Sequence, residues 1–320
     1  MHARPRYRHA RHDRHLDTTK GKPMRSKPLV AELLVDSRAT IGEGPVWNEA
    51  RQRLLWVDIP KNHVLCFDPS SGASTTKDLG QSVGSVAICY DGGLIAALRD
   101  GFGFLPAGSS VISEFIEVEK DKPANRMNDG KCDCMGRFWA GTMATDHRPS
   151  AGTLYRLERS AIGFTVLPIL DGITIANGLD WSPDNKRMYY IDSATQRIDM
   201  FDFDAEHGTL SGRRPFVEIP ASEGLPDGMT TDAEGYVWVA LFRAGKVRRY
   251  RPSGTVDMEV TVPVSLVTSC AFGGRDLASL YITTARHRLT AEEAAVQTTA
   301  GGVFVCRPGP VGRKPFVFGR

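Results

Sequence analysis

The chain has 320 residues, of which 41% are hydrophobic and 24% charged, and its formal net charge at pH 7 is +3. This balance is typical of a soluble globular protein, and the length allows one large domain or two ordinary ones. No apolar run approaches the roughly 20 residues that a membrane-spanning helix needs, so we expect no membrane partner.

Residues 1–28 are rich in Arg, Lys and His and contain almost no large aliphatic side chains. Such a segment cannot bury a core, so we predict a disordered basic N-terminal extension. It lacks the apolar stretch of a secretory signal. An unstructured extension accounts for the basic residues, and we therefore expect no nucleic acid partner. Residues 29–320 are predicted to form a single domain.

Six segments after residue 50 combine a polar turn with an apolar strand. In chain order they are "QRLLWVDI", "GGLIAALR", "GRFWAGTM", "KRMYYIDS", "GYVWVALF" and "ASLYITTA". Intervals of 40, 43, 51, 48 and 43 residues separate their central positions, which are Trp56, Ala96, Trp139, Tyr190, Trp238 and Tyr281. Each interval holds further strand-like segments, and the best helical segment, "TAEEAAVQ" near residue 290, is short.

A repeat of this length with about four strands per unit is typical of a β-propeller blade. The sequence therefore predicts an all-β fold, a six-bladed β-propeller closed into a ring. A large β-sandwich would not account for the repeat. The tryptophans of these strands are expected to fill the spaces between blades. Asp58 and Asp192, at equivalent positions in "WVD" and "YID", are expected to make structural hydrogen bonds.

Four of the six repeats place an oxygen-bearing side chain 10 to 13 residues before the central strand position, at Glu43, Asp129, Asn177 and Asp227. Rotation about the propeller axis relates equivalent positions, so we expect these side chains to surround one mouth of the central channel. Buried acids are costly without a partner, and a cation would balance them. Glu, Asn and Asp oxygens suit Ca²⁺, Mg²⁺ or Mn²⁺, and carboxylates also bind Zn²⁺. The repeat thus predicts a central metal site, although a single pair of this kind is more often only a turn.

The motifs "GEGPVW", "NRMNDGKCDCMGRFWAGTM", "IANGLDWSPDNKRMYYIDS", "LPDGMTTDAEGYVWVA" and "TSCAFGG" closely resemble the senescence marker protein, regucalcin and gluconolactonase family. The resemblance runs from about Leu29 to about Lys314. It implies a six-bladed propeller that holds one divalent metal ion and hydrolyses sugar lactones. On this resemblance the metal ligands are Glu43, Asn177 and Asp227, and Asp227 is also the general base.

The same resemblance implies substrate contacts for Arg126 and Asn128 in "NRMNDG". It also implies one for Asp146, where animal members of the family have a glutamate. The predicted function is metal-dependent hydrolysis of aldonolactones to aldonic acids in carbohydrate metabolism. The sequence leaves open whether the cofactor is Ca²⁺, Zn²⁺, Mn²⁺, Mg²⁺ or Fe²⁺, and whether the substrate is a glucono-, galactono-, arabinono- or xylonolactone.

Several other functions stay open at this stage. One is a calcium-binding regulatory protein without catalysis, a second is an esterase or phosphotriesterase, and a third is an interaction scaffold. A serine hydrolase is disfavoured because no GxSxG motif occurs. The six cysteines are scattered and form no CxxC pair, so we expect them to be reduced and the protein to be cytoplasmic.

Overall fold

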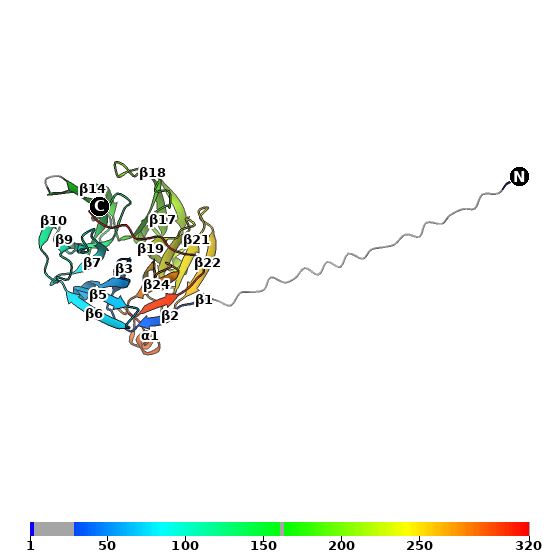
Figure 1. Ribbon diagram of the computed structural model, residues 1–320, viewed down its shortest axis with the longest axis horizontal. Coiled ribbons are helices and arrows are strands. Elements are labelled where there is room, and N and C mark those ends of the chain that lie inside the picture. Colours follow the sequence, from blue (N-terminus) through cyan, green and yellow to red (C-terminus); the bar gives the residue numbers. More distant parts are fainter. Residues whose placement is uncertain (3–28, 161–162, 320) are drawn as a thin grey trace.

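A computed structural model describes residues 1–2, 29–160 and 163–319. Six antiparallel sheets stand around a central axis like the blades of a ring (Figure 1). This confirms the prediction of an all-β, six-bladed β-propeller. The extension predicted for residues 1–28 lies, apart from Met1 and His2, outside the described residues.

Blades 1 to 3 follow the chain from the inner strand to the outer strand. Blade 1 consists of β3 (Gly42–Asn48), β4 (Arg53–Asp58), β5 (His63–Asp68) and β6 (Ala73–Asp78). Blade 2 consists of β7 (Val83–Ile88), β8 (Leu94–Leu98), β9 (Gly101–Leu105) and β10 (Glu114–Glu117). Blade 3 consists of β11 (Asn125–Cys132), β12 (Phe138–Ala144), β13 (Gly152–Ser160) and β14 (Gly163–Ile173).

Blades 4 to 6 repeat this order, and the N-terminal part of the domain completes the ring. Blade 4 consists of β15 (Ala176–Trp181), β16 (Arg187–Asp192), β17 (Arg197–Asp204) and β18 (Thr209–Glu218). Blade 5 consists of β19 (Leu225–Thr231), β20 (Val237–Phe242), β21 (Lys246–Tyr250) and β22 (Val256–Thr261), with β1 (Leu29–Val30) added in parallel to β22. Blade 6 consists of β23 (Val267–Gly273), β24 (Ser279–Thr284), β25 (Val303–Cys306) and, as its outer strand, β2 (Glu32–Val35). Because β2 comes from the start of the domain, the antiparallel pairing of β2 with β25 closes the ring.

The six central positions of the sequence repeat all lie in the second strand of a blade, so the repeat was assigned correctly. The five tryptophans are at most 2% exposed and contribute to the cores within and between blades. Trp139 and Trp181, for example, pack edge to face with ring centroids 5.9 Å apart. Each such side chain removes about 150–250 Å² from water, which makes these rings major contributors to the core.

Asp58 and Asp192 make the structural hydrogen bonds that the repeat predicted. The carboxylate of Asp58 accepts from the backbone N–H groups of Thr40 and Ile41, at 2.9 and 3.2 Å. Asp192 accepts in the same way from Thr174 and Ile175, both at 2.9 Å. Each bond pair holds the segment that enters an inner strand, β3 or β15, at the same end of the ring.

Short helical turns lie in the connections between strands. They are η1 (Ile59–Lys61), η2 (Ser193–Thr195), η3 (Ala221–Glu223) and α1 (Ala291–Val296). The expected short helix is α1, and its first turn is capped by the Thr290 hydroxyl and the Glu293 carboxylate. No helix in the described part of the chain is long and apolar enough to cross a membrane. All six cysteines lie among the described residues, and none forms a disulfide.

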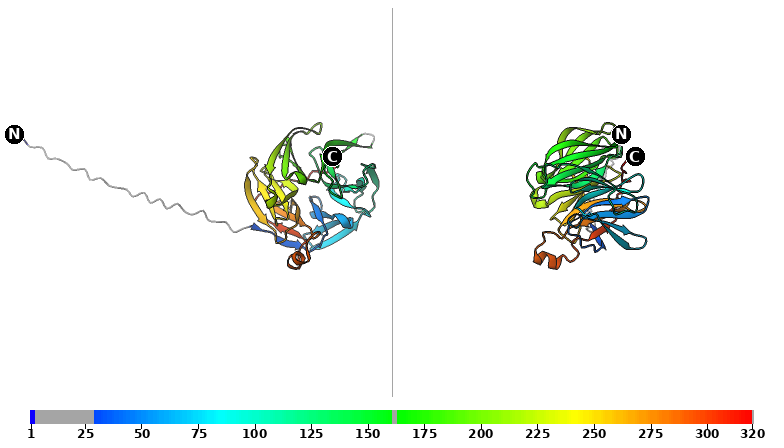
Figure 2. Two further views of the ribbon diagram at one scale, coloured as in Figure 1. Left: turned by 180° about the vertical axis from the view of Figure 1, so that it is seen from behind. Right: turned by 90° about the vertical axis from the view of Figure 1, so that its left-hand side faces the viewer.

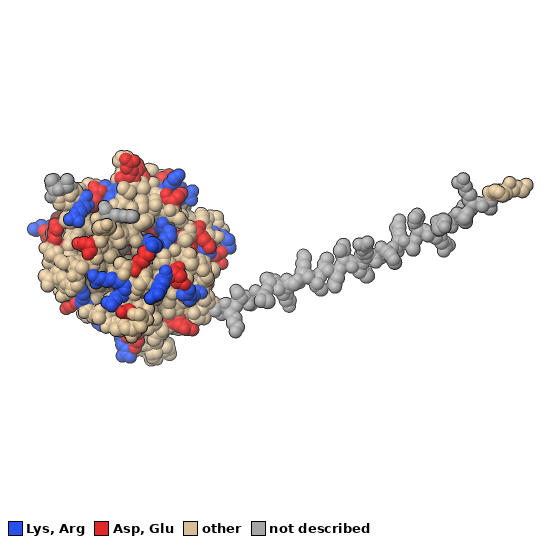
Figure 3. Space-filling model, in the orientation of Figure 1, with Lys and Arg blue, Asp and Glu red and all other residues tan. Residues whose placement is uncertain are grey.

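The C-terminal segment, residues 312–319, crosses the ring on the face opposite to α1 (Figure 2). It bridges to blade 5 through Gly312 and Asp232, and to blade 2 through Phe318 and Cys89. Figure 3 shows this face, on which acidic and basic side chains are interspersed. The segment therefore crosses one end of the channel, opposite the end at which α1 lies.

Candidate functional site

A cavity of about 270 Å³ opens at the end of the channel where the inner strands begin. Its polar wall is formed by Glu43 of β3, Arg126 and Asn128 of β11, Asn177 of β15 and Asp227 of β19. Four blades thus bring together five of the six residues that the sequence placed in the site. Apolar side chains form much of the remaining wall, among them Ile41, Ile59, Met143, Ile175, Leu225 and Phe242.

Breaks in strand pairing turn these side chains into the channel. In each of blades 3, 4 and 5 two residues of the inner strand have no partner on the second strand. The first residue of each unpaired pair is Asn128, Asn177 or Asp227. An irregularity of this kind bends a strand and changes the direction of its side chains.

The same register corrects one sequence assignment. The spacing placed Asp129 at the level of Asn177 and Asp227, whereas the structure places Asn128 there. Asp129 follows one residue later and lines a different cavity. The irregularity is the same in all three blades, so Asp129 takes the position that Gly178 and Gly228 have in blades 4 and 5.

Glycines let neighbouring inner strands approach closely at this level. A Cβ atom on Gly178 would lie 2.7 Å from the carbonyl oxygen of Asp227, which is too close for any side chain. A Cβ atom on Gly228 would overlap the side chain of Ser269. The Asn-Gly and Asp-Gly pairs thus combine a polar ligand with the close packing that brings the ligands together.

Glu43 and Asp227 form a pair of buried acids. Their residues are only 6% and 7% exposed, and the two carboxyl groups lie close enough to shift one another's pKa. Burial and the nearby Asp129 charge raise the pKa of Glu43 to about 8. Burial, Glu43 and Asp129 raise the pKa of Asp227 well above its usual range. The Arg126 guanidinium partly counteracts the shift of Glu43.

A chain of hydrogen bonds orients the amide side chains. Arg126 Nη1 donates to Asn128 Oδ1 at 2.7 Å, and Asn128 Nδ2 donates to Asn177 Oδ1 at 2.8 Å. Asn177 Nδ2 donates to the Ser193 hydroxyl at 2.7 Å, which itself donates to the Pro226 carbonyl at 2.6 Å. Because the Ser193 hydroxyl donates its proton to the Pro226 carbonyl, it can only accept from Asn177. This fixes the Asn177 Nδ2 group toward Ser193 and the Oδ1 atom away from it.

Asp146 is the one predicted site residue that lies apart from the others. Its side chain is 56% exposed and pairs with Arg148 at 3.1 Å. It is not part of the cavity wall, although its neighbours Thr145 and His147 are. Its contact with substrate stays a prediction.

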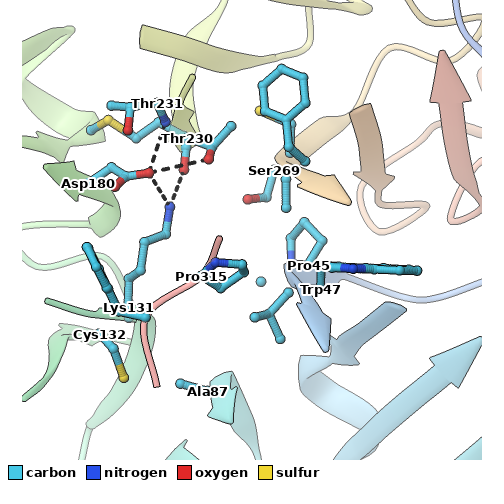
Figure 4. A pocket seen from close by; sticks show the side chains of 18 of the residues that line it. Pro45, Trp47, Ala87, Lys131, Cys132, Asp180, Thr230, Thr231, Ser269 and Pro315 are labelled. Carbon is cyan, nitrogen blue, oxygen red and sulfur yellow. Dashed lines mark hydrogen bonds and ion pairs between the residues drawn. The ribbon is translucent and has the colours of Figure 1, made fainter. Parts of the chain in front are cut away.

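The opposite end of the channel holds a second, smaller cavity of about 70 Å³ (Figure 4). Here Lys131 Nζ donates to Asp180 Oδ2 and to the Met229 carbonyl, both at 2.9 Å. Arg313 of the C-terminal segment reaches Asp180 at 3.2 Å from the other side. Asp180 is thus paired from two sides, which is typical of a structural acid.

Three basic residues at the cavity mouth were not predicted from the sequence. His147, His287 and Arg288 line the larger cavity, whereas the sequence showed histidines that were only dispersed. Their positions in the repeat could have indicated this, since all three residues lie in the loop that follows the second strand of a blade. All such loops end at the same mouth.

The polar wall fits a divalent cation by its donor chemistry. Burial and neighbouring acids raise the pKa values of the Glu43 and Asp227 carboxyl groups, and the oriented oxygen of Asn177 lies in the same cavity wall. A hard divalent cation would stabilise the ionised form of both acids and could be bound by all three oxygens. Within residues 29–160 and 163–319 no three His, Cys, Asp or Glu side chains gather at a possible metal site, and a cation in this wall would need the Asn177 oxygen as its third donor.

The fold and the site together define a class: six-bladed propellers with a buried, oxygen-lined cavity at one mouth of the channel. The family model described as SMP-30/Gluconolactonase/LRE-like region matches residues 41–286, and the chain belongs to this family.

Relatives span nearly the whole chain. A Bacillus subtilis protein, described by name as a candidate sugar lactone lactonase, is 37% identical over 289 residues, which are 90% of this chain and 98% of that protein. Regucalcin from Xenopus laevis is 38% identical over 279 residues, 85% of this chain and 92% of that protein. The crystal structure of a calcium-binding protein, regucalcin, from Agrobacterium tumefaciens matches with a TM-score of 0.86 and 28% identity, covering 91% of this chain and 98% of that one.

Proposed function

We propose that this protein is a metal-dependent lactonase that hydrolyses aldonolactones to aldonic acids. The observation that carries the proposal is the pair of buried acids, Glu43 and Asp227, beside an oriented amide in an open cavity. The lactonase names within the family support the same reaction class. A cavity with apolar walls and a few convergent polar groups suits a small ring compound.

In this proposal Glu43, Asn177 and Asp227 hold one divalent cation. When bound, such an ion supplies Lewis acidity at the lactone carbonyl and stabilises the oxyanion that forms there. The donor set alone leaves the choice among Ca²⁺, Mg²⁺, Mn²⁺, Zn²⁺ and Fe²⁺ to experiment.

Asp227 is the proposed general base. It accepts a proton from the attacking water while the water oxygen bonds to the lactone carbonyl carbon. As the carbonyl re-forms, the bond to the ring oxygen breaks and that oxygen takes up the proton, which gives the open hydroxy acid.

Arg126 and Asn128 are the proposed substrate contacts. Arg126 Nη1 is bound to Asn128 and to the Met127 carbonyl at 3.0 Å, so the guanidinium has a fixed direction. Burial lowers the pKa of Arg126 to about 10, which still leaves it charged at neutral pH. It can donate from its remaining nitrogens to a ring hydroxyl or carbonyl oxygen.

A panel of neutral aldonolactones tests the proposal in a pH-indicator assay. Metal-stripped protein should be inactive, and one or more divalent ions should restore turnover. Absence of turnover with every ion would contradict the proposal.

A calcium-binding regulatory protein is the second candidate, favoured by the relatives named regucalcin. Selective Ca²⁺ binding without hydrolysis of any lactone in the same panel would establish it. Hydrolysis of a phosphotriester or another ester in preference to every lactone would instead indicate the esterase alternative.

A further inference from the structure

Three basic side chains, His147, His287 and Arg288, form a group that we call the mouth cluster. All three line the larger cavity. Arg288 Nη2 lies 3.2 Å from His147 Nε2, and Arg288 Nε lies 3.3 Å from His287 Nε2. The cluster is therefore a connected group and not three separate surface residues.

The mouth cluster spans the channel. His147 follows β12 of blade 3, whereas His287 and Arg288 follow β24 of blade 6. In a ring of six blades, blades 3 and 6 stand opposite one another. The contact between Arg288 and His147 thus joins loops from opposite sides above the buried acids.

No acid balances the charge of the cluster. Among the ion pairs of residues 29–160 and 163–319, none involves Arg288. The acids nearest in sequence are Asp146, Glu292 and Glu293. Asp146 pairs with Arg148, Glu293 caps α1 and lies 4.0 Å from Arg243, and Glu292 is exposed in the first turn of α1. Within the cavity the acids are Glu43 and Asp227, which are the proposed cation ligands.

The electrostatic surroundings of His147 point the same way. Burial, Arg288 and Arg126 lower the pKa of His147, while Asp146 opposes them. Arg288 at the mouth and Arg126 in the wall thus both bring positive charge close to His147.

The backbone supports a binding role for the two residues that meet across the mouth. His147 and Arg288 have φ angles of 60° and 67°, in the left-handed region that is unfavourable for residues with a Cβ atom. Such conformations are common at ligand sites, where the surrounding structure holds them in place.

We propose that the mouth cluster binds an anionic group of the substrate, a carboxylate or a phosphate. This inference rests on the proposed lactonase function and specifies its substrate class: sugar lactones with a negative charge at the end remote from the lactone carbonyl. Arg288 offers the charged, forked donor that suits such oxyanions. The lactone ring then lies between the cluster and the buried acids.

The kinetic test compares kcat/KM for three probes with the metal-loaded full chain. The probes are neutral glucono-1,5-lactone, glucaro-1,4-lactone with a carboxylate, and 6-phosphoglucono-1,5-lactone with a phosphate. We expect at least one anionic probe to have a kcat/KM about tenfold above the neutral one, mainly through KM. The carboxylate and phosphate probes distinguish the two sources of charge.

The substitution Arg288→Gln should reduce this preference by about tenfold, which corresponds to about 1.4 kcal/mol. The matched control is Arg286→Gln, because Arg286 is an exposed arginine of the same loop that does not line the cavity. A preference for the neutral lactone would overturn the proposal. So would an Arg288→Gln variant in which all three probes lose activity equally, since that result indicates a structural role.

A binding experiment separates failure of this inference from failure of the proposed function. Calorimetry compares gluconate with 6-phosphogluconate and glucarate, each of which carries an additional anionic group. Tighter binding of an additionally charged ligand, lost in Arg288→Gln and kept in Arg286→Gln, supports the mouth cluster even if no lactone is hydrolysed. Equal binding of all three ligands to the unmodified protein contradicts it.

Discussion

The two ends of the central channel contain acids of nearly equal burial in opposite electrostatic situations. Asp180 is 6% exposed and Asp227 is 7% exposed. Burial alone would raise the pKa of Asp180, but Lys131 and Arg313 lower it below its usual value. Burial raises the pKa of Asp227, and the neighbouring acids Glu43 and Asp129 raise it further. Burial therefore does not separate a structural acid from a functional one, and the charges around it do.

The two ends of the channel also differ in what covers them. The C-terminal segment supplies Arg313 to the paired end and covers it. The unpaired end stays open and retains two acids whose ionisation the protein alone does not support. Five experiments test this contrast.

Replacing the acid of the open end should have the largest effect. Asp227→Asn removes the proposed base and one cation ligand, and we expect kcat to fall by about a thousandfold or more. Thermal stability of the metal-free protein should be kept or increased, because one of two adjacent buried acids becomes neutral. Lactone turnover and thermal unfolding measure the two effects. The control Asp129→Asn should retain most of its turnover, and a near-normal rate for Asp227→Asn at saturating metal would contradict the assignment.

Replacing the acid of the closed end should instead affect stability. Asp180→Asn leaves Lys131 and Arg313 without their partner, and we expect a loss of about 3 kcal/mol in the free energy of unfolding. Denaturant unfolding measures the loss, and turnover at low temperature should change little. If Asp180→Asn lost turnover but kept its stability, Asp180 would be a functional acid and not a structural one.

The pH dependence of the same variant follows from the direction of the Asp180 shift. The folded pKa lies below the ordinary value of 3.8, so the stabilising effect of Asp180 is present above that value. It is lost as the pH falls through the folded pKa. Asp180→Asn should therefore lose less stability than the unmodified protein when the pH falls below about 4.

A divalent cation should stabilise only the open end. At a free concentration a hundred times its Kd, it should raise the free energy of unfolding by about 2.7 kcal/mol. Glu43→Gln should abolish most of this gain, and Asp180→Asn should retain it. Thermal unfolding with and without chelator measures the difference. An equal gain in Glu43→Gln would place the ion elsewhere.

The smallest effect concerns the serine that orients Asn177. Ser193→Ala frees the Asn177 amide, and we expect the metal affinity to fall about tenfold. The free energy of unfolding should fall by about 1 kcal/mol for the lost hydrogen bond. Calorimetric titration with metal measures the affinity. Ser182→Ala is the matched control, because Ser182 bonds to Asp184 in a turn of the same blade and not to a site residue.

Much of the fold was predictable from the sequence, because a propeller repeats its local signals. The strands around Trp56, Trp139 and Trp238 are short, apolar and preceded by polar turns, and their spacing set the number of blades. The structural role of Asp58 and Asp192 followed from their equivalent positions. That Glu43, Asn177 and Asp227 line one cavity was also predictable, since rotation places equivalent residues at one mouth.

Tertiary structure alone decided features that depend on register or on contacts between distant segments. The strand irregularity placed Asn128, and not Asp129, at the level of Asn177. The closing strand β2 and the segment around Arg313 reach partners far away in sequence, and no local pattern specifies these pairings. The mouth cluster exists only because blades 3 and 6 face each other. Local sequence determines which elements form, whereas ring closure and strand register determine which side chains meet.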